Sequence, residues 1–177
     1  TITALTNYGG AVDTAGLQGS VTDSVGSGLL KLGGNVTYNV STNANAYGTM
    51  TIGGNLDLNG ATRTYTINDT AGLTEDTLVS GVIQNSSGTA GLTKAGDGTL
   101  QLSGNNTYNG DTTVSAGTLA LSHATSTNTI ASSPNIIVDS GATLDVSGVS
   151  AGFEVASGQT LRGEGTVTGN TTIGNGG

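Results

Sequence analysis

A short strand pattern that occurs twice in close succession limits the folds open to this chain. Residues 99–102 read TLQL and residues 118–121 read TLAL. Successive side chains of a strand point to opposite faces, so the two leucines of each segment share one face. Leu100 and Leu119 are separated by about one coil of a chain that winds round an axis and stacks on itself. The spacing predicts that these leucines lie on successive coils of a β-solenoid.

Other segments of the chain repeat in the same way. Residues 26–39 (GSGLLKLGGNVTYN) match residues 96–109 (GDGTLQLSGNNTYN) at nine of 14 positions, with an offset of 70. Residues 48–52 match residues 117–121 at an offset of 69, and residues 136–146 match residues 153–163 at an offset of 17. The shortest of these units are too small for propeller blades, which need about 40–50 residues.

Composition favours an all-β fold. The chain has 31 glycines and 9% charged residues, and its short apolar runs alternate with period two between glycine and asparagine. Disorder is the main alternative, but disordered chains are usually richer in charge and proline, and this chain has one proline. A β-sandwich would normally bury more aromatic side chains than the 3% present here.

We therefore expect a right-handed parallel β-helix, or a close β-solenoid relative. At about 20 residues a coil, it would have about eight coils. We expect residues 1–177 to form a single domain, which is a segment of a longer repetitive chain. Two half-domains that meet near Gly88 are the alternative.

The stretch from Gly91 to Leu121 also resembles a known family, the autotransporter-associated β-strand repeat, or passenger-associated repeat, of secreted and surface β-helical proteins of bacteria. The resemblance rests on GLTK at 91–94, GDGTL at 96–100, LSGN at 102–105, TY at 107–108, TTV at 112–114 and GTL at 117–119. It implies an extracellular or cell-surface location, and it marks fold and export rather than an activity. The residues expected to carry the repeat are Gly98, Leu100, Leu102, Gly104, Asn105, Tyr108, Val114, Gly117, Leu119 and Leu121.

The charge of the chain argues against two classes of partner. Four basic residues oppose 12 acidic ones, which gives a net charge of −8. Nucleic acid and anionic lipid both need a basic surface, so we expect neither as a partner. No apolar run approaches the roughly 18 or more residues of a membrane span, and we expect no membrane insertion of this segment.

Catalytic residues are sparse in the sequence. His123 is the only histidine and is interpreted as a loop residue. Glu75 and Asp76 are the only adjacent acids, and neighbours in a strand would point to opposite faces rather than form the pair that glycoside cleavage needs. We therefore expect no enzyme activity, no metal site and no cofactor. A β-helical enzyme acting on polysaccharides is the least supported alternative.

The sequence therefore favours a structural role, as a stalk, adhesin shaft or extracellular matrix element. Its expected partners are neighbouring repeats or copies of itself, which would pair through the coil ends. One alternative is a subunit that assembles end to end into an extracellular filament. Another is a binding module for a cell-surface or glycan ligand that uses residues 122–134, interpreted as a protruding loop or lateral excursion.

Overall fold

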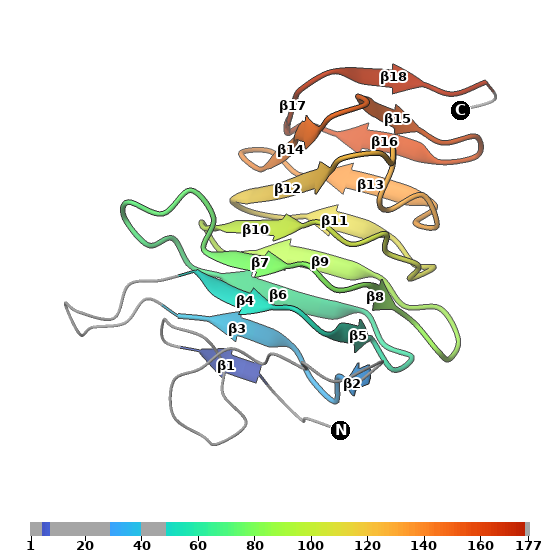
Figure 1. The fold of residues 1–177 in the computed structure, drawn as a ribbon. Coiled ribbons are helices and arrows are strands. Elements are labelled where there is room, and N and C mark those ends of the chain that lie inside the picture. Colours follow the sequence, from blue (N-terminus) through green and yellow to red (C-terminus); the bar gives the residue numbers. More distant parts are fainter. Residues whose placement is uncertain (1–4, 8–28, 40–48, 176–177) are drawn as a thin grey trace.

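The chain winds into a parallel β-solenoid whose coils stack from one end of the molecule to the other (Figure 1). The computed structural model describes residues 5–7, 29–39 and 49–175. All strand pairings among these residues are parallel. No helix long and apolar enough to cross a bilayer occurs in this part of the chain.

Two long sheets form two faces of the solenoid. The first sheet has the order β1 (Leu5–Asn7), β3 (Val36–Tyr38), β6 (Arg63–Ile67), β9 (Leu92–Ala95), β11 (Thr112–Val114), β13 (Asn135–Val138) and β16 (Thr160–Gly163). The second has the order β4 (Met50–Ile52), β7 (Thr77–Val79), β10 (Thr99–Leu102), β12 (Thr118–His123), β14 (Thr143–Val149) and β17 (Thr166–Thr168).

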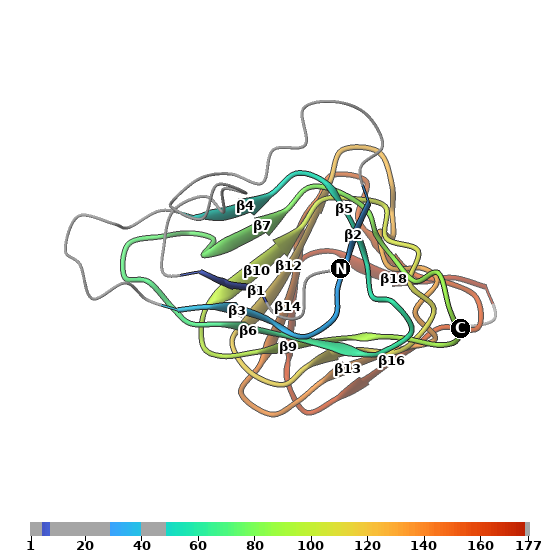
Figure 2. The same cartoon turned by 90° about the horizontal axis from the view of Figure 1, so that it is seen from below.

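A third face closes the cross-section, which is roughly triangular when the molecule is seen along its axis (Figure 2). It holds a sheet of β2 (Leu29–Lys31), β5 (Asn55–Asp57) and β8 (Ile83–Gln84), and a separate pair of β15 (Phe153–Val155) and β18 (Thr171–Ile173). Irregular backbone joins the two groups, because Thr107 N donates to Ile83 O and Asn106 N donates to Thr129 O, both at 2.8 Å. The third face is therefore continuous from the first group of strands to the second.

The central sequence prediction is confirmed. Leu100 pairs with Leu119 and Leu102 pairs with Leu121 across β10 and β12, in parallel register. All four leucines are buried. The coil that runs from Leu100 to Leu119 thus places each leucine directly over its equivalent in the coil before it.

The expected number of about eight coils is wrong. In the first sheet, Val36 pairs with Tyr65 and Arg63 pairs with Leu92. The next three pairings lead from Leu92 to Thr112, then to Ile136 and then to Leu161. Only five turns therefore separate Val36 from Leu161, because most corners are longer than those of the coil between Leu100 and Leu119.

The segment matched at an offset of 70 is not equivalent in space to the central repeat. Leu30 lies in β2 on the third face, whereas Leu100 lies in β10 of the second sheet. Leu30 stacks instead on Leu56, which stacks on Ile83. The offset is therefore not a whole number of coils. Residues 26–28 of this segment lie outside the described residues.

The interior is a single aliphatic core with a few aromatic side chains. It includes Tyr38, Tyr65, Tyr108 and Phe153, each at most 1% exposed, among Leu, Val and Ile side chains. In β6, Tyr65 and Ile67 are directed inward. Period-two alternation thus directs these two side chains into the core.

Candidate functional site

The ten repeat residues divide into an apolar set and a corner set. Leu100, Leu102, Leu119, Leu121, Val114 and Tyr108 are buried in the core. The Tyr108 hydroxyl lies 2.6 Å from Thr112 Oγ1 and so has a partner inside the coil. The remaining four, Gly98, Gly104, Asn105 and Gly117, lie at corners.

The three glycines stand where backbone from the neighbouring coil leaves no room for a side chain. A Cβ at Gly104 would lie 2.3 Å from Gly81 O, and one at Gly117 would lie 2.4 Å from Gly96 O. Gly117 also has a φ of +62°, a conformation that glycine adopts readily. In this part of the repeat, the backbone of one coil thus lies directly against that of the next.

The asparagine that organises its corner is Asn106 rather than the expected Asn105. Asn105 is exposed, whereas Asn106 is buried. Asn106 Oδ1 accepts from Ile83 N, and its Nδ2 donates to Gly104 O, both at 2.9 Å. This side chain therefore joins two coils through hydrogen bonds to backbone.

A buried lysine connects two coils at another corner. Lys94 points inward from β9 and is 0% exposed. Its Nζ donates to Gly96 O at 2.7 Å, to Ala95 O at 3.0 Å and, in the next coil, to Ala116 O at 3.1 Å. Burial lowers the pKa of Lys94 to about 8, and the carboxylates of Asp76 and Asp97 oppose this shift.

Asp76, one of the two adjacent acids in the sequence, is buried in the same region. It is 1% exposed, accepts from Thr70 N at 2.7 Å through Oδ1, and accepts from Thr99 N at 2.8 Å through Oδ2. Its neighbour Glu75 lines an outer groove instead. No pattern in the sequence indicated that Asp76 and Lys94 would both be buried.

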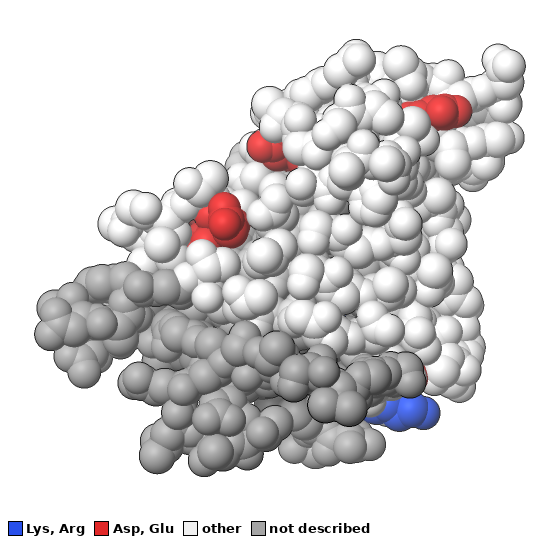
Figure 3. Space-filling model, in the orientation of Figure 1, with Lys and Arg blue, Asp and Glu red and all other residues white. Residues whose placement is uncertain are grey.

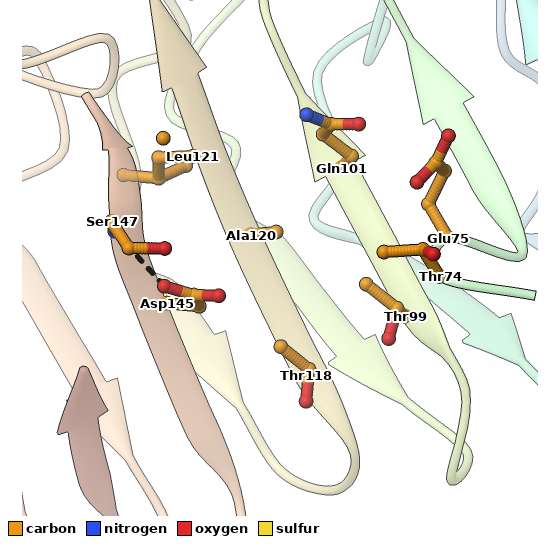
Figure 4. A pocket seen from close by; sticks show the side chains of 10 residues that line it. Thr74, Glu75, Thr99, Gln101, Thr118, Ala120, Leu121, Asp145 and Ser147 are labelled. Carbon is orange, nitrogen blue, oxygen red and sulfur yellow. Dashed lines mark hydrogen bonds between the residues drawn. The ribbon is translucent and has the colours of Figure 1, made fainter. Parts of the chain in front are cut away.

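The groove lies on the outer face of the second sheet and has a volume of about 310 Å³. Figure 4 shows Glu75 and Gln101 on one side, Asp145 and Ser147 on the other, and Ala120 between them. Gln101, Ala120 and Asp145 form one row across β10, β12 and β14. The rest of the lining consists of Thr74, Thr99, Thr118, Leu121 and Gly148.

A β-bulge shapes one wall of this groove. Ala120 pairs with Asp145 but Ser122 pairs with Gly148, so β14 has one extra residue between these positions. Bulges bend a strand and redirect its side chains. Here Ser147 N donates to Asp145 Oδ1 at 2.9 Å, which holds the carboxylate at the edge of the groove.

The groove has no basic residue, and all four basic side chains of the chain are placed elsewhere. Lys31 lies 3.9 Å from Asp57, and Arg63 donates to the carbonyl oxygens of Leu58 and Leu32. Lys94 is buried, and Arg162 is in β16 of the first sheet. Figure 3 shows scattered acidic groups on a mostly uncharged face, with basic atoms only at its lower edge.

Residues 122–134 are not simply a protruding loop. Thr129, Ile130 and Ser133 are buried, and Gln159 Nε2 donates to Ile130 O at 3.0 Å and to Ser133 O at 2.7 Å. His123 ends β12, and its Nδ1 accepts from Ser126 N at 2.9 Å. The segment thus forms part of the wall of its coil, because Ile130 joins the core.

Among the described residues, no three His, Asp or Glu side chains gather as a metal site.

Comparison with known proteins agrees with this fold. Residues 92–121 match the model of the passenger-associated-transport-repeat family. An extracellular serine protease of Serratia marcescens is 41% identical over 83 residues, which are 46% of this chain and 7% of that protein. The adhesin BmaC autotransporter of Brucella suis biovar 1 (strain 1330) is 38% identical over 145 residues, 82% of this chain and 4% of that protein. No solved structure matches the chain.

The two relatives are thus many times longer than the part that this chain matches. The family match covers β9 through β12, the coil in which Leu100 and Leu119 stack and Lys94 joins two turns. The chain is a parallel β-solenoid of autotransporter-passenger type, and its residues 92–121 are a passenger-associated transport repeat.

Proposed function

We propose that this chain is a non-enzymatic structural section of a bacterial protein that is secreted or displayed at the cell surface. In this role it is a stalk, an adhesin shaft or an extracellular matrix element, which sets the distance between other parts of a longer protein. The names of the two relatives, an extracellular serine protease and an autotransporter adhesin, support an extracellular location.

The observation that carries this proposal is the continuity of the two long sheets. Six strands follow one another in the second sheet from β4 to β17, each paired with the next. Such a stack adds one strand spacing, about 4.8 Å, for each coil. The stability of such a fold is approximately a sum over neighbouring coils, so coils can be added without loss of stability. A fold that can be lengthened in this way suits a spacer.

We also propose that the solenoid is right-handed. Connections between parallel strands of one sheet are right-handed in about 98% of cases. A structure determined by experiment would test the hand of the coils, and a left-handed path would contradict the proposal.

Removing one whole coil tests the spacer role. Deletion of residues 100–118 joins Thr99 to Leu119, which occupy neighbouring register positions in β10 and β12. We expect the shortened chain to fold. We also expect the longer protein that contains it to remain functional, with a rod that electron micrographs show to be one coil shorter. A matched deletion of residues 100–109 removes half a coil and should prevent folding. Loss of function in a well-folded whole-coil deletion would contradict the spacer role.

End-to-end assembly into a filament is a second candidate, favoured by two apolar side chains that are exposed on β17 and β18. β17 and β18 are the last strands of their sheets, and Val167 and Ile173 are 37% and 63% exposed. Unpaired strand edges of this kind pair readily with another chain. Sedimentation at rising concentration should then show growing assemblies that Ile173→Lys abolishes, whereas a monomer at all concentrations would exclude a filament.

A further inference from the structure

The groove on the second sheet has features of a binding site that the spacer role does not require. Its lining offers two carboxylates, from Glu75 and Asp145, the amide of Gln101, and several hydroxyl groups. Gln101, Thr118 and Asp145 project from successive strands of the sheet, and Glu75 lies in the corner just before β7. Sites built on sheets hold polar groups in fixed positions, which favours selective binding.

The charges of the groove define the charge of its occupant. Neither Glu75 nor Asp145 has a basic partner among the described residues, where the one ion pair joins Lys31 and Asp57. Gln101 and Asp145 lie two strands apart, or about 10 Å, and Glu75 precedes β7, which is one strand beyond Gln101. The groove therefore presents two separated negative charges, which complement a ligand with more than one cationic group.

The size and polarity of the groove define the rest of the ligand. A volume of about 310 Å³ lies at the lower end of small-molecule sites, which measure about 300–1,000 Å³. Protein partners depend on aromatic or aliphatic anchors in apolar pockets, and the centre of this groove is the methyl group of Ala120. The abundance of hydroxyl, amide and carboxylate groups instead suits a ligand rich in hydroxyl groups.

From these features we propose that the groove binds a short oligosaccharide with free amino groups. The sugar lies across β10, β12 and β14, over Ala120. Its ammonium groups pair with Glu75 and Asp145, while Gln101 and the hydroxyl groups of Thr118 and Ser147 bond its hydroxyls. This site is independent of the spacer role, because the coil-deletion experiment tests the spacer role and the titration below tests the site.

The test is a titration of the full chain, followed by NMR or calorimetry, with glucosamine oligomers, their fully N-acetylated forms and an oligolysine of equal charge. We expect only the free-amine sugars to bind. Asp145→Asn and Glu75→Gln, which keep the shape of each side chain, should each weaken binding about tenfold, the effect of losing one charge-assisted contact. Ala120→Met should block the groove without a change of charge.

Asp139→Asn is the matched control, because it removes the same charge from an exposed residue outside the groove. It should leave binding unchanged, and thermal unfolding should show that all variants are folded. Equal binding of the N-acetylated oligomers or of oligolysine would overturn the proposal, as would a total absence of binding. An equal loss in Asp139→Asn would also overturn it, since binding would then depend only on net charge.

Discussion

The carboxylate of Asp76 occupies the space that a side chain at Gly98 would need. A Cβ built on Gly98 would lie 2.7 Å from Asp76 Oδ2 and 2.8 Å from the carbonyl carbon of Asn68. The same Oδ2 accepts a hydrogen bond from Thr99 N at 2.8 Å, which fixes the start of β10. Gly98 is thus needed in the repeat because a buried acid from the preceding coil lies against it.

Gly98→Ala should therefore destabilise the fold. The added methyl group must displace backbone and a bonded carboxylate, and overpacking of this kind costs about 1–3 kcal/mol. Denaturant unfolding of the variant measures the loss. Gly53→Ala is the control, because a Cβ there would meet only Ser80 Oγ at 3.9 Å, and its effect should stay within about 0.5 kcal/mol. Equal effects at the two positions would contradict the steric explanation.

Truncation of a leucine that is stacked between two coils should strongly lower the free energy of unfolding. Leu119 is 0% exposed and lies between Leu100 and Leu144 in the second sheet. Leu119→Ala should lower the free energy of unfolding by about 2–5 kcal/mol, since it leaves a cavity between two coils. Val167→Ala, in β17, should cost less than about 1 kcal/mol because its side chain is 37% exposed. A small effect at Leu119 would refute the stacked core.

Lys94 should make stability rise with pH. Its pKa falls to about 8 in the folded chain from a usual 10.5, so between these values the unfolded chain binds more protons than the folded one. The free energy of unfolding then rises across the window, by up to about 3 kcal/mol. Urea titrations from pH 7.5 to 10 measure this slope. Lys94→Met should abolish it and Lys31→Met, at an exposed lysine, should keep it.

Above pH 10 the trend should reverse because of two buried tyrosines. Burial raises the pKa of Tyr65 and of Tyr108, so the folded chain keeps protons that the unfolded chain releases near pH 10. Their stabilising contribution is present below that pH and is lost as the pH rises. The stability curve should peak near pH 10, and Tyr108→Phe should weaken the decline. A curve that keeps rising to pH 11.5 would exclude this behaviour.

Asp57 should contribute to stability at neutral pH and lose its contribution in acid. Burial raises its pKa, but hydrogen bonds from Ser86 and Asn59 and the charge of Lys31 outweigh this and lower the pKa overall. The contribution is complete above the usual pKa of 3.8 and disappears as the pH falls through the lower folded-state value. Asp57→Asn should therefore reduce stability at pH 7 and flatten the curve below pH 4. Asp139→Asn, at an exposed acid, should not flatten it.

The sequence predicted those features that depend on neighbouring residues along the chain. Alternation with period two identified Leu100, Leu102, Leu119 and Leu121 as inward residues. The close spacing of the two leucine pairs identified the stacked strands β10 and β12, because this coil is short and its corners are tight. Each of these features depends on residues within one short segment, so the sequence of that segment is enough to predict it.

The tertiary structure alone decided how the coils align. The length of each corner sets which strand lies over which, and for this reason the segment at residues 29–39 falls on other faces than its match in the central repeat. Asp76 and Lys94 are buried because residues from neighbouring coils cover them and offer hydrogen-bond partners.

The groove depends on the same alignment. It needs Glu75, Gln101 and Asp145 on the same outer face of neighbouring coils, although the first and the last are far apart in the sequence. Periodicity in a sequence determines which face of a strand is inside, because that depends only on alternation along one strand. The pairing of successive coils is what brings distant side chains together, and it depends on corners whose lengths follow no regular pattern.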